Sequence, residues 1–154
     1  MTDGVVAGLF TAGGAGEDMR ENEQVTLVTG VGIDGDRYAS GSGKWSQTPA
    51  TGRQVTLIEA EAIEAMRRDY NVEVRPADAR RNILTRGVAL NHLVGQEFTV
   101  GTARLRGVRL AEPCAYLASL TRPGVARGLV HRGGLRADVL EGAVVRLGDR
   151  VRPT

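Results

Sequence analysis

The sequence predicts a mainly β protein, a closed or nearly closed β-barrel with a few short helices packed on it. Short runs rich in Val, Leu, Ile and Thr recur along the chain, and 21 glycines among the 154 residues punctuate them. Strands joined by tight glycine turns produce this pattern. Only one segment has a convincing long helical pattern, whereas a doubly wound parallel sheet needs regular helices between its strands. The barrel is therefore the predicted architecture.

The first elements predicted are two strands, residues 4–10 and 23–33, both rich in apolar and β-branched side chains. The stretch between them, "TAGGAGEDMREN" at 11–22, has the composition of a loop. A third strand is expected at 53–58, where "RQVTLI" leads directly into the helical segment.

The main helix is predicted within 56–70, "TLIEAEAIEAMRRDY". Thr56 and Glu59 have the spacing of a capping box, which would start the helix there. Arg67 and Arg68 near its end favour the negative end of the helix dipole. Its apolar face comprises Ile58, Ala62, Ile63 and Met66.

In the middle of the chain, Pro76 and Gly87 break any long element, so a short helical turn and a strand around 82–85 are expected. Residues 97–112 predict a hairpin with its turn at Gly101–Thr102. The apolar positions change parity near Gly107, which indicates a β-bulge.

The last third is predicted to be helical on either side of Pro123 and to end at the pair Gly133–Gly134. Two short strands around a turn at Glu141–Gly142 then close the chain. No composition shift marks a linker, so residues 1–154 are expected to form a single domain.

Composition and charge limit the classes of function. The 20 basic residues face 18 acidic ones and are scattered, which does not favour a nucleic-acid partner despite a pI near 9.1. The single cysteine excludes an internal disulfide and fits a reducing compartment. No run of 18 apolar residues and no basic leader are present, so we expect a cytoplasmic protein without a membrane partner.

Common catalytic motifs are missing from the sequence. The histidines, His92 and His131, lie far apart and lack the spacing of a zinc site. "GSGKWS" at 41–46 resembles a phosphate loop but is not followed by a helix pattern. No serine-nucleophile elbow is visible either.

Cys114 is the first candidate functional residue. It follows Pro113 and precedes a run that could begin a helix, where free N–H groups and the dipole lower a thiol pKa. A thiolate is a nucleophile and a soft metal ligand. The alternative is a small buried side chain that only fills space.

Two further candidates are polar clusters. The segment "DARRNILTRG" could bind an anion, because arginine forks bind phosphate or carboxylate and an asparagine amide can both donate and accept; the alternative is a solvated arginine face. In "GIDGDRYASGSGKW", Asp36 and Arg37 could form a charge pair that orients a loop, or simply a structural turn. The residues of the first cluster are Arg80, Arg81, Asn82, Thr85 and Arg86.

Taken in order, a series of sequence blocks resembles a small bacterial stand-alone MOSC-domain protein, related to the C-terminal domain of molybdenum cofactor sulfurases. The resemblance extends over roughly residues 5–151. The blocks are "GIDGDRYASGSGKW", "RQVTLIEAEAIEAM", "ARRNILTRGVALNHLVGQEFTVG", "EPC" and "LEGAVVRLGD".

This resemblance implies a MOSC-type barrel, similar to the pyruvate-kinase barrel, and a molybdenum cofactor (Mo-pterin). It implies that Cys114 is both the catalytic residue and the molybdenum ligand. It also implies a cofactor-binding set in which Arg80 and Asn82 hold the pterin and phosphate. The other members of that set are Arg81, Thr85, Asp36 and Arg37. Cofactor-binding relatives carry a lysine in the first loop, which here reads "TAGGAGEDM" and has none.

Three functions follow as hypotheses. The first is a molybdenum-cofactor-dependent oxidoreductase that reduces N-hydroxylated bases or amidoximes, with a separate electron-donor reductase as partner. The second is a sulfur carrier or transfer domain that uses a Cys114 persulfide in metal-sulfur centre assembly and receives sulfur from a donor protein. The third is a non-catalytic barrel that binds an anion or nucleic acid. The first two would make the protein an enzyme.

Overall fold

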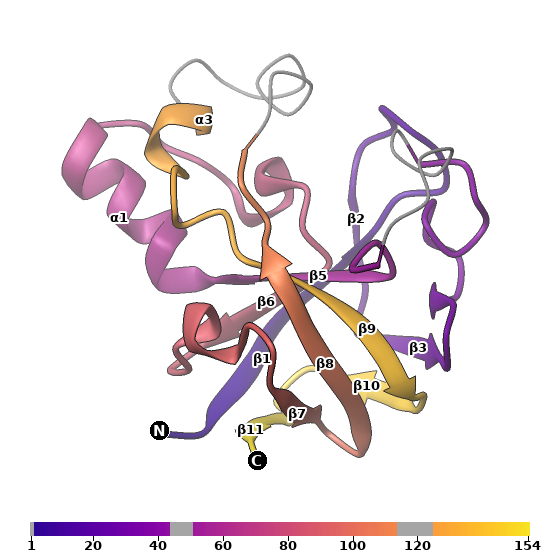
Figure 1. Cartoon of the computed structure of the whole chain (residues 1–154). Helices are drawn as coiled ribbons and strands as arrows, with labels where there is room; N and C mark the ends of the chain where they lie inside the picture. The colour runs from indigo at the N-terminus through magenta and orange to yellow at the C-terminus, as the bar shows by residue number, and fades with distance from the viewer. Residues whose placement is uncertain (1, 44–50, 114–124) are drawn as a thin grey trace.

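Seven strands close into a β-barrel in the computed structural model, which describes residues 2–43, 51–113 and 125–154 (Figure 1). The strand order around the barrel is β11-β7-β8-β9-β5-β6-β1, and pairing of β1 with β11 closes it. Strands β5 and β6 are parallel and the other neighbours are antiparallel. The predicted mainly β barrel is thus confirmed. Its strands are β1 (Gly4–Thr11), β5 (Val55–Glu59), β6 (Ile83–Arg86), β7 (Glu97–Val100), β8 (Ala103–Leu110), β9 (Leu135–Glu141) and β11 (Arg150–Pro153).

Smaller elements are added to the barrel. Strand β2 extends the sheet beyond β1, and β10, β3 and β4 form a separate three-stranded sheet. None of the helices in the described residues is long and apolar enough to cross a membrane. These elements are β2 (Arg20–Glu21), β3 (Gln24–Val28), β4 (Gly32–Ile33), β10 (Val144–Arg146), the helices α1 (Ala60–Tyr70) and α3 (Val125–Gly128), and the 3-10 turns η1 (Pro76–Ala79) and η2 (Leu90–Leu93).

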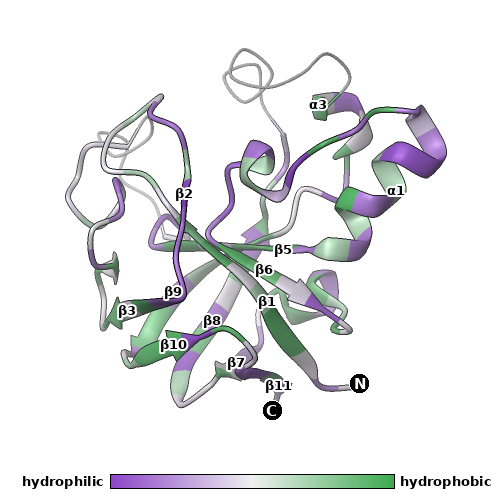
Figure 2. Cartoon of the chain, turned by 180° about the vertical axis from the view of Figure 1, so that it is seen from behind, coloured by the Kyte–Doolittle hydropathy of each residue, from purple (hydrophilic) through white to green (hydrophobic). Residues whose placement is uncertain are grey.

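The apolar side chains form two cores, because alternate residues of a strand face opposite sides of the sheet. All seven barrel strands contribute to the first core, for example Leu57 of β5 and Phe98 of β7. The second core joins Ile58 to Met66 of α1, Val125 of α3 and Leu129, which directly follows α3. Strands β5 and β6 are correspondingly hydrophobic in Figure 2. Helix α1 is therefore fixed on the outer face of the barrel.

The predicted start of the helix is wrong. Strand β5 continues through Glu59, and α1 begins at Ala60 without a side-chain cap. Thr56 lies within the strand and is buried, so it does not serve a capping box. Pairing of β5 with β6 and β9 explains the difference, since tertiary pairing overrides a local capping signal. The predicted Arg67 and Arg68 do lie in the last turn of α1.

The central predictions are confirmed. Strand β6 matches the strand expected around 82–85, and β7 and β8 form the hairpin with its turn at Gly101 and Thr102. The register between β8 and β9 shifts at Gly107, where the bulge was predicted. An added Cβ at Gly107 would lie 2.1 Å from the carbonyl oxygen of Leu93, so the bulge also admits a close backbone neighbour.

Other boundaries differ from the prediction. The expected strand 23–33 is divided into β3 and β4, and the expected loop 11–22 contains β2. The chain ends with three strands, β9, β10 and β11, rather than the predicted two. Strand β10 follows β9 but pairs with β3. Helix α3 ends at Gly128, short of the pair Gly133–Gly134, and Pro123 lies outside the described residues.

Candidate functional site

The predicted site residues of the described chain are all buried, and together with Thr56 they are here called the polar cluster. Three of its members, Asp36, Thr56 and Asn82, meet where the end of β1, strand β5 and the start of β6 reach the turn after β4. Burial of so many polar groups is tolerated only when their hydrogen bonds are satisfied. The polar cluster comprises Asp36, Arg37, Thr56, Arg80, Arg81, Asn82 and Thr85, all buried.

Asn82 connects three segments through its side chain. Its Oδ1 accepts from the backbone N and the Oγ1 of Thr56, at 3.1 and 3.2 Å. Its Nδ2 donates to the Phe10 carbonyl at 3.0 Å and to Oδ1 of Asp36 at 3.3 Å. The amide is therefore engaged on both sides by the protein and braces β5, β1 and the turn after β4.

Asp36 and Arg37 form a buried ion pair, with Arg37 Nη1 3.1 Å from Asp36 Oδ1. The same carboxylate accepts from the backbone N–H groups of Ala12 and Tyr38, at 3.1 and 3.3 Å. The Arg37 guanidinium also lies over the Tyr38 ring, 4.9 Å from its centroid. The two alternatives considered from the sequence therefore coincide: the charge pair holds a structural turn in place.

Arg81 fastens both ends of the segment that contains Cys114. Its Nε donates to the Gly133 carbonyl and its Nη2 to the Ala111 carbonyl, both at 2.8 Å. An added Cβ on Gly133 would lie 3.4 Å from Cδ of Pro113, so Pro113 is next to this anchor. Cys114 itself lies outside the described residues.

Arg80 reaches the first loop of the chain. Its backbone is left-handed, with φ at 57°, and ends the turn η1. Its Nη1 donates to the Glu17 carbonyl at 2.7 Å. This bond brings a guanidinium to the loop at residues 11–19, which contains no lysine. Thr85 instead points to the β5–α1 junction, where its Oγ1 donates to the Ile58 carbonyl at 3.4 Å.

The polar cluster carries an excess of positive charge. The charged side chains buried in the described residues are Arg37, Arg80 and Arg81 against Asp36, a formal charge of three positive and one negative. Such a cluster favours an anion at the nearby surface, and arginine binds phosphate well. Arg86, also considered for this group, is exposed and pairs with Glu64 on α1.

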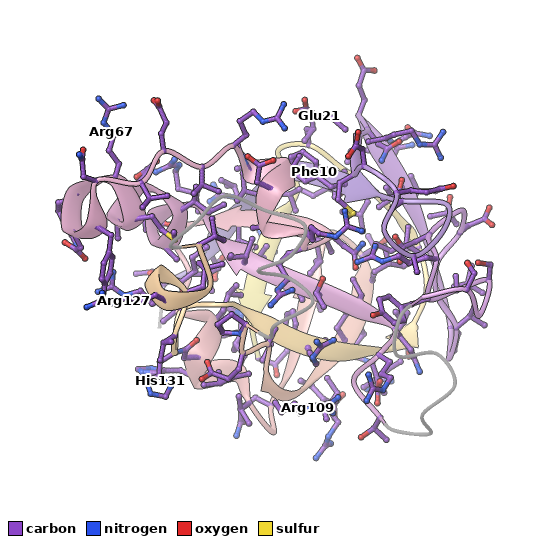
Figure 3. All side chains as sticks on the ribbon, turned by 90° about the horizontal axis from the view of Figure 1, so that it is seen from above. Phe10, Glu21, Arg67, Arg109, Arg127 and His131 are labelled. Atoms are coloured by element: carbon purple, nitrogen blue, oxygen red, sulfur yellow. The ribbon has the colours of Figure 1, made fainter. Side chains whose placement is uncertain are left out.

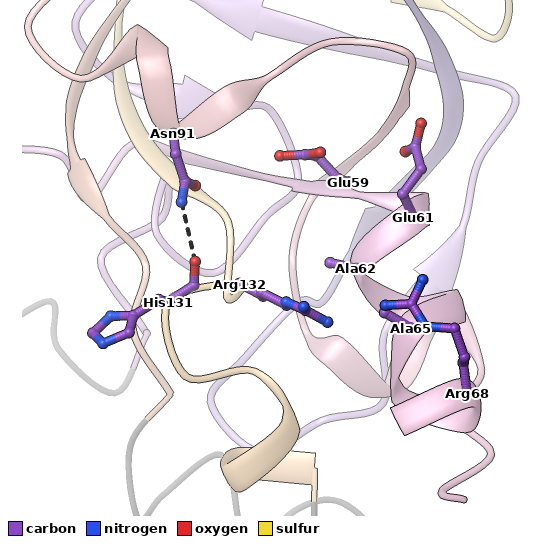
Figure 4. A pocket seen from close by; sticks show the side chains of 8 residues that line it. All are labelled: Glu59, Glu61, Ala62, Ala65, Arg68, Asn91, His131 and Arg132. Carbon is purple, nitrogen blue, oxygen red and sulfur yellow. Dashed lines mark hydrogen bonds between the residues drawn. The ribbon is translucent and has the colours of Figure 1, made fainter. Parts of the chain in front are cut away.

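A cavity beside α1 could not be predicted from the sequence, because its residues come from four separate segments. The cavity measures about 260 Å³. Figure 4 shows side chains from the end of β5, α1, η2 and the segment before β9 around it. Charged residues of both signs in the predicted helix, among them Glu61 and Arg68, were a signal for it. The lining residues are Glu59, Glu61, Ala62, Ala65, Arg68, Asn91, His131 and Arg132.

The geometry of this cavity is fixed by bonds to its rim. Asn91 Nδ2 donates to the His131 carbonyl at 3.0 Å. The His131 ring lies 3.1 Å from a carboxylate oxygen of Glu112, two residues before Cys114. Burial raises the pKa of the Glu59 carboxyl, opposed by a hydrogen bond from the Leu90 N–H. Among the described residues, no group of three or more His, Cys, Asp or Glu side chains could hold a metal ion.

Figure 3, seen from above, shows labelled side chains on two different sides of the molecule. Arg67, Arg127 and His131 lie on the side of α1 and α3, whereas Phe10 and Glu21 lie on the side of β1 and β2. A second cavity of about 360 Å³ opens on another face of α1. Its lining is mostly apolar and includes Ile63, Val74 and Leu84.

Comparisons with known proteins agree on one family. The model of the MOSC domain matches residues 34–152. Among curated protein sequences, none matches this chain.

Several solved structures share the fold. The YuaD protein from Bacillus subtilis is similar with a TM-score of 0.81 and 17% identity, over 97% of this chain and 94% of that one. YiiM from Geobacillus stearothermophilus is similar with a TM-score of 0.72 and 12% identity, over 98% of this chain and 75% of that one. YiiM from Escherichia coli is similar with a TM-score of 0.67 and 18% identity, over 100% of this chain and 70% of that one. Since the family model extends over most of the chain and the barrel agrees with these structures, the chain belongs to the MOSC domain family.

Proposed function

We propose that this protein binds the molybdenum cofactor through Cys114 and reduces N-hydroxylated bases or amidoximes. The observation that carries the proposal is the anchoring of the Cys114 segment by Arg81, which belongs to the polar cluster. Both the cysteine segment and the arginine segment thereby originate at the same end of the barrel. Membership of the MOSC domain family supports a link to the molybdenum cofactor.

The chemistry of the donor set fits such a cofactor. A thiolate is a soft ligand suited to a metal, and the excess of buried arginine suits a pterin phosphate. Arg80 would face the phosphate, because its bond to Glu17 places positive charge at the loop that lacks the lysine. Cys114 would be the ligand to molybdenum.

The remaining members of the polar cluster act indirectly. The side chain of Asn82 is bonded to Thr56, Phe10 and Asp36, and that of Arg81 to two carbonyls, so both hold segments in place. Such supporting contacts preserve the orientation of the groups that bind a ligand. When bound, the cofactor would supply the redox centre. Reduction of an N-hydroxylated base takes up two electrons and two protons, breaks the N–O bond and releases water, with a reductase partner as electron donor.

The test is metal and pterin analysis of protein purified anaerobically from a host that synthesises the cofactor. We expect molybdenum and pterin in the wild type and their loss in Cys114→Ser. The molybdenum and pterin content of Arg81→Met should be about ten-fold to hundred-fold lower than that of the wild type, the usual effect of removing a residue that supports a metal ligand. Arg152→Met, an exposed arginine on β11, should retain the wild-type content. Absence of molybdenum and pterin from the fresh wild type would reject the proposal.

The sulfur-transfer alternative has a distinct outcome in the same preparation. A persulfide on Cys114, detected by mass spectrometry without molybdenum or pterin, would support it. If Cys114→Ser leaves metal content, sulfur loading and reductase activity unchanged, the cysteine serves packing only. Wild-type protein without molybdenum, pterin, persulfide or reductase activity would instead support the non-catalytic barrel.

A further inference from the structure

The cavity beside α1 has two ends of opposite charge. At one end, Glu59 is the last residue of β5 and Glu61 lies in the first turn of α1. At the other end, the guanidinium groups of Arg68 and Arg132 reach the cavity (Figure 4). The floor between them is formed by the methyl groups of Ala62 and Ala65.

The acidic end has hydrogen-bonding capacity to spare. Glu59 Oε2 accepts from the Leu90 N–H at 3.3 Å, and Glu61 Oε2 accepts from the Gly87 N–H at 2.8 Å. In the described part of the chain, neither carboxylate forms an ion pair and the other oxygen of each accepts no hydrogen bond. Burial raises the pKa of Glu59, which means that the ionised carboxylate is poorly solvated. A cation bound here would offset that loss of solvation.

The basic end has spare positive charge. Arg68 and Arg132 both bind Asp69, with closest contacts of 2.7 and 3.0 Å. One carboxylate thus serves two guanidinium groups. Arg68 binds it through Nε and Nη2, and Arg132 through Nη1, so Arg68 Nη1 and Arg132 Nη2 make no hydrogen bond to other described residues.

We propose that this cavity binds a small zwitterion, with its ammonium group at Glu59 and Glu61 and its carboxylate at Arg68 and Arg132. The volume of about 260 Å³ is just below the roughly 300 Å³ of the smallest typical ligand pockets, which suits an amino acid. A dianion would be repelled by the two glutamates, and a metal cation by the two arginines. A ligand that carries both charges meets an opposite charge at each end.

The first experiment is calorimetric titration of the metal-free full chain at low salt. The probes are ω-amino acids from β-alanine to 6-aminohexanoate, each compared with the alkylamine and the carboxylate of the same chain length. At least one amino acid should bind, with each single-charge analogue about ten-fold weaker or more. Salt should weaken binding.

The second experiment uses variants. Glu59→Gln and Arg132→Gln should each lower the affinity about ten-fold or more. Ala62→Leu should abolish binding without removing a charge, because its side chain fills the floor. Glu64→Gln and Arg67→Gln are matched controls, since they line the second cavity and not this one. Thermal melts confirm folding, and Glu61→Gln replaces Glu59→Gln if the latter does not fold.

The proposal is overturned if no amino acid of the series binds at millimolar concentration. It is also overturned if single-charge analogues bind equally well, or if the cavity variants bind like the wild type. Because metal-free protein is used, failure here leaves the molybdenum proposal standing, and loss of molybdenum leaves this one standing.

Discussion

At the residue scale, the polar cluster works as a set of braces. Asn82 joins Thr56, Phe10 and Asp36, and Arg81 joins the carbonyls of Ala111 and Gly133. Buried groups of this kind contribute little net energy while paired, but a partner left unpaired costs much more. Their substitution should therefore have large effects.

Asn82→Ala should lower the free energy of unfolding by about 3 kcal/mol or more, because it leaves several buried groups without partners. Asn91→Ala is the matched control, since the exposed Asn91 makes one side-chain bond to the His131 carbonyl. It should cost no more than about 1 kcal/mol. Urea unfolding of both variants measures the difference, and equal losses would show that Asn82 is no brace.

Asp69 gives a prediction with a defined pH range. Hydrogen bonds from Arg68 and then Arg132 lower its pKa from 3.8 to about 2. Because the pKa of the folded state is the lower one, the stabilisation is complete above about pH 4 and is lost as the pH falls through about 2.

Urea midpoints of the wild type and Asp69→Asn, measured against pH, should therefore differ above about pH 4 and converge towards about pH 2. Asn91→Ala, which removes no ionisable group, should differ from the wild type by an amount that does not change with pH. A constant difference between wild type and Asp69→Asn at every pH would contradict this assignment.

At the scale of elements, the contact between β5 and the start of β9 permits only glycine at one position. Gly134 directly precedes β9 and has a φ of 102°. An added Cβ would lie 1.9 Å from the carbonyl oxygen of Leu57. Both the backbone conformation and the space therefore require glycine there.

Gly134→Ala should lower the free energy of unfolding by about 3 kcal/mol or more, since strain at positive φ is joined by a backbone clash. Gly148→Ala separates the two effects. Its φ is 86° but nothing lies within 4 Å of an added Cβ, so about 1 kcal/mol is expected. Thermal unfolding of both variants decides, and similar losses would assign the effect to φ alone.

At the scale of the whole molecule, closure of the barrel depends on β11. This strand pairs with β7 on one side and β1 on the other, so it joins the two ends of the chain. Val151 is fully buried at this junction, whereas the neighbouring Arg152 is exposed.

Val151→Ser should therefore cost about 3 kcal/mol of unfolding free energy, through lost apolar burial and a buried hydroxyl. Arg152→Ser should cost less than about 1 kcal/mol. Denaturant unfolding checks both values. If the two variants lose equally, burial at the closing strand does not hold the barrel together.

The sequence by itself determined the class of fold and several of its details. Alternating apolar residues and glycine turns depend only on residues close together in the chain. The strand near 82–85, the β7–β8 hairpin and the bulge at Gly107 could therefore all be predicted. The capping box at Thr56 could not be judged locally, because pairing of β5 with β6 and β9 decides where the strand ends.

Only the tertiary structure decided how the predicted residues are used. The sequence predicts Arg81 and Asn82 as anion-binding groups, and the structure adds that their side chains bond to Gly133, Ala111 and Thr56, in segments 26 to 52 residues away. The cavity beside α1 likewise joins residues from Glu59 to Arg132. Long-range contacts of this kind leave no periodic pattern in a sequence, because they arise when a closed barrel brings distant segments to one end.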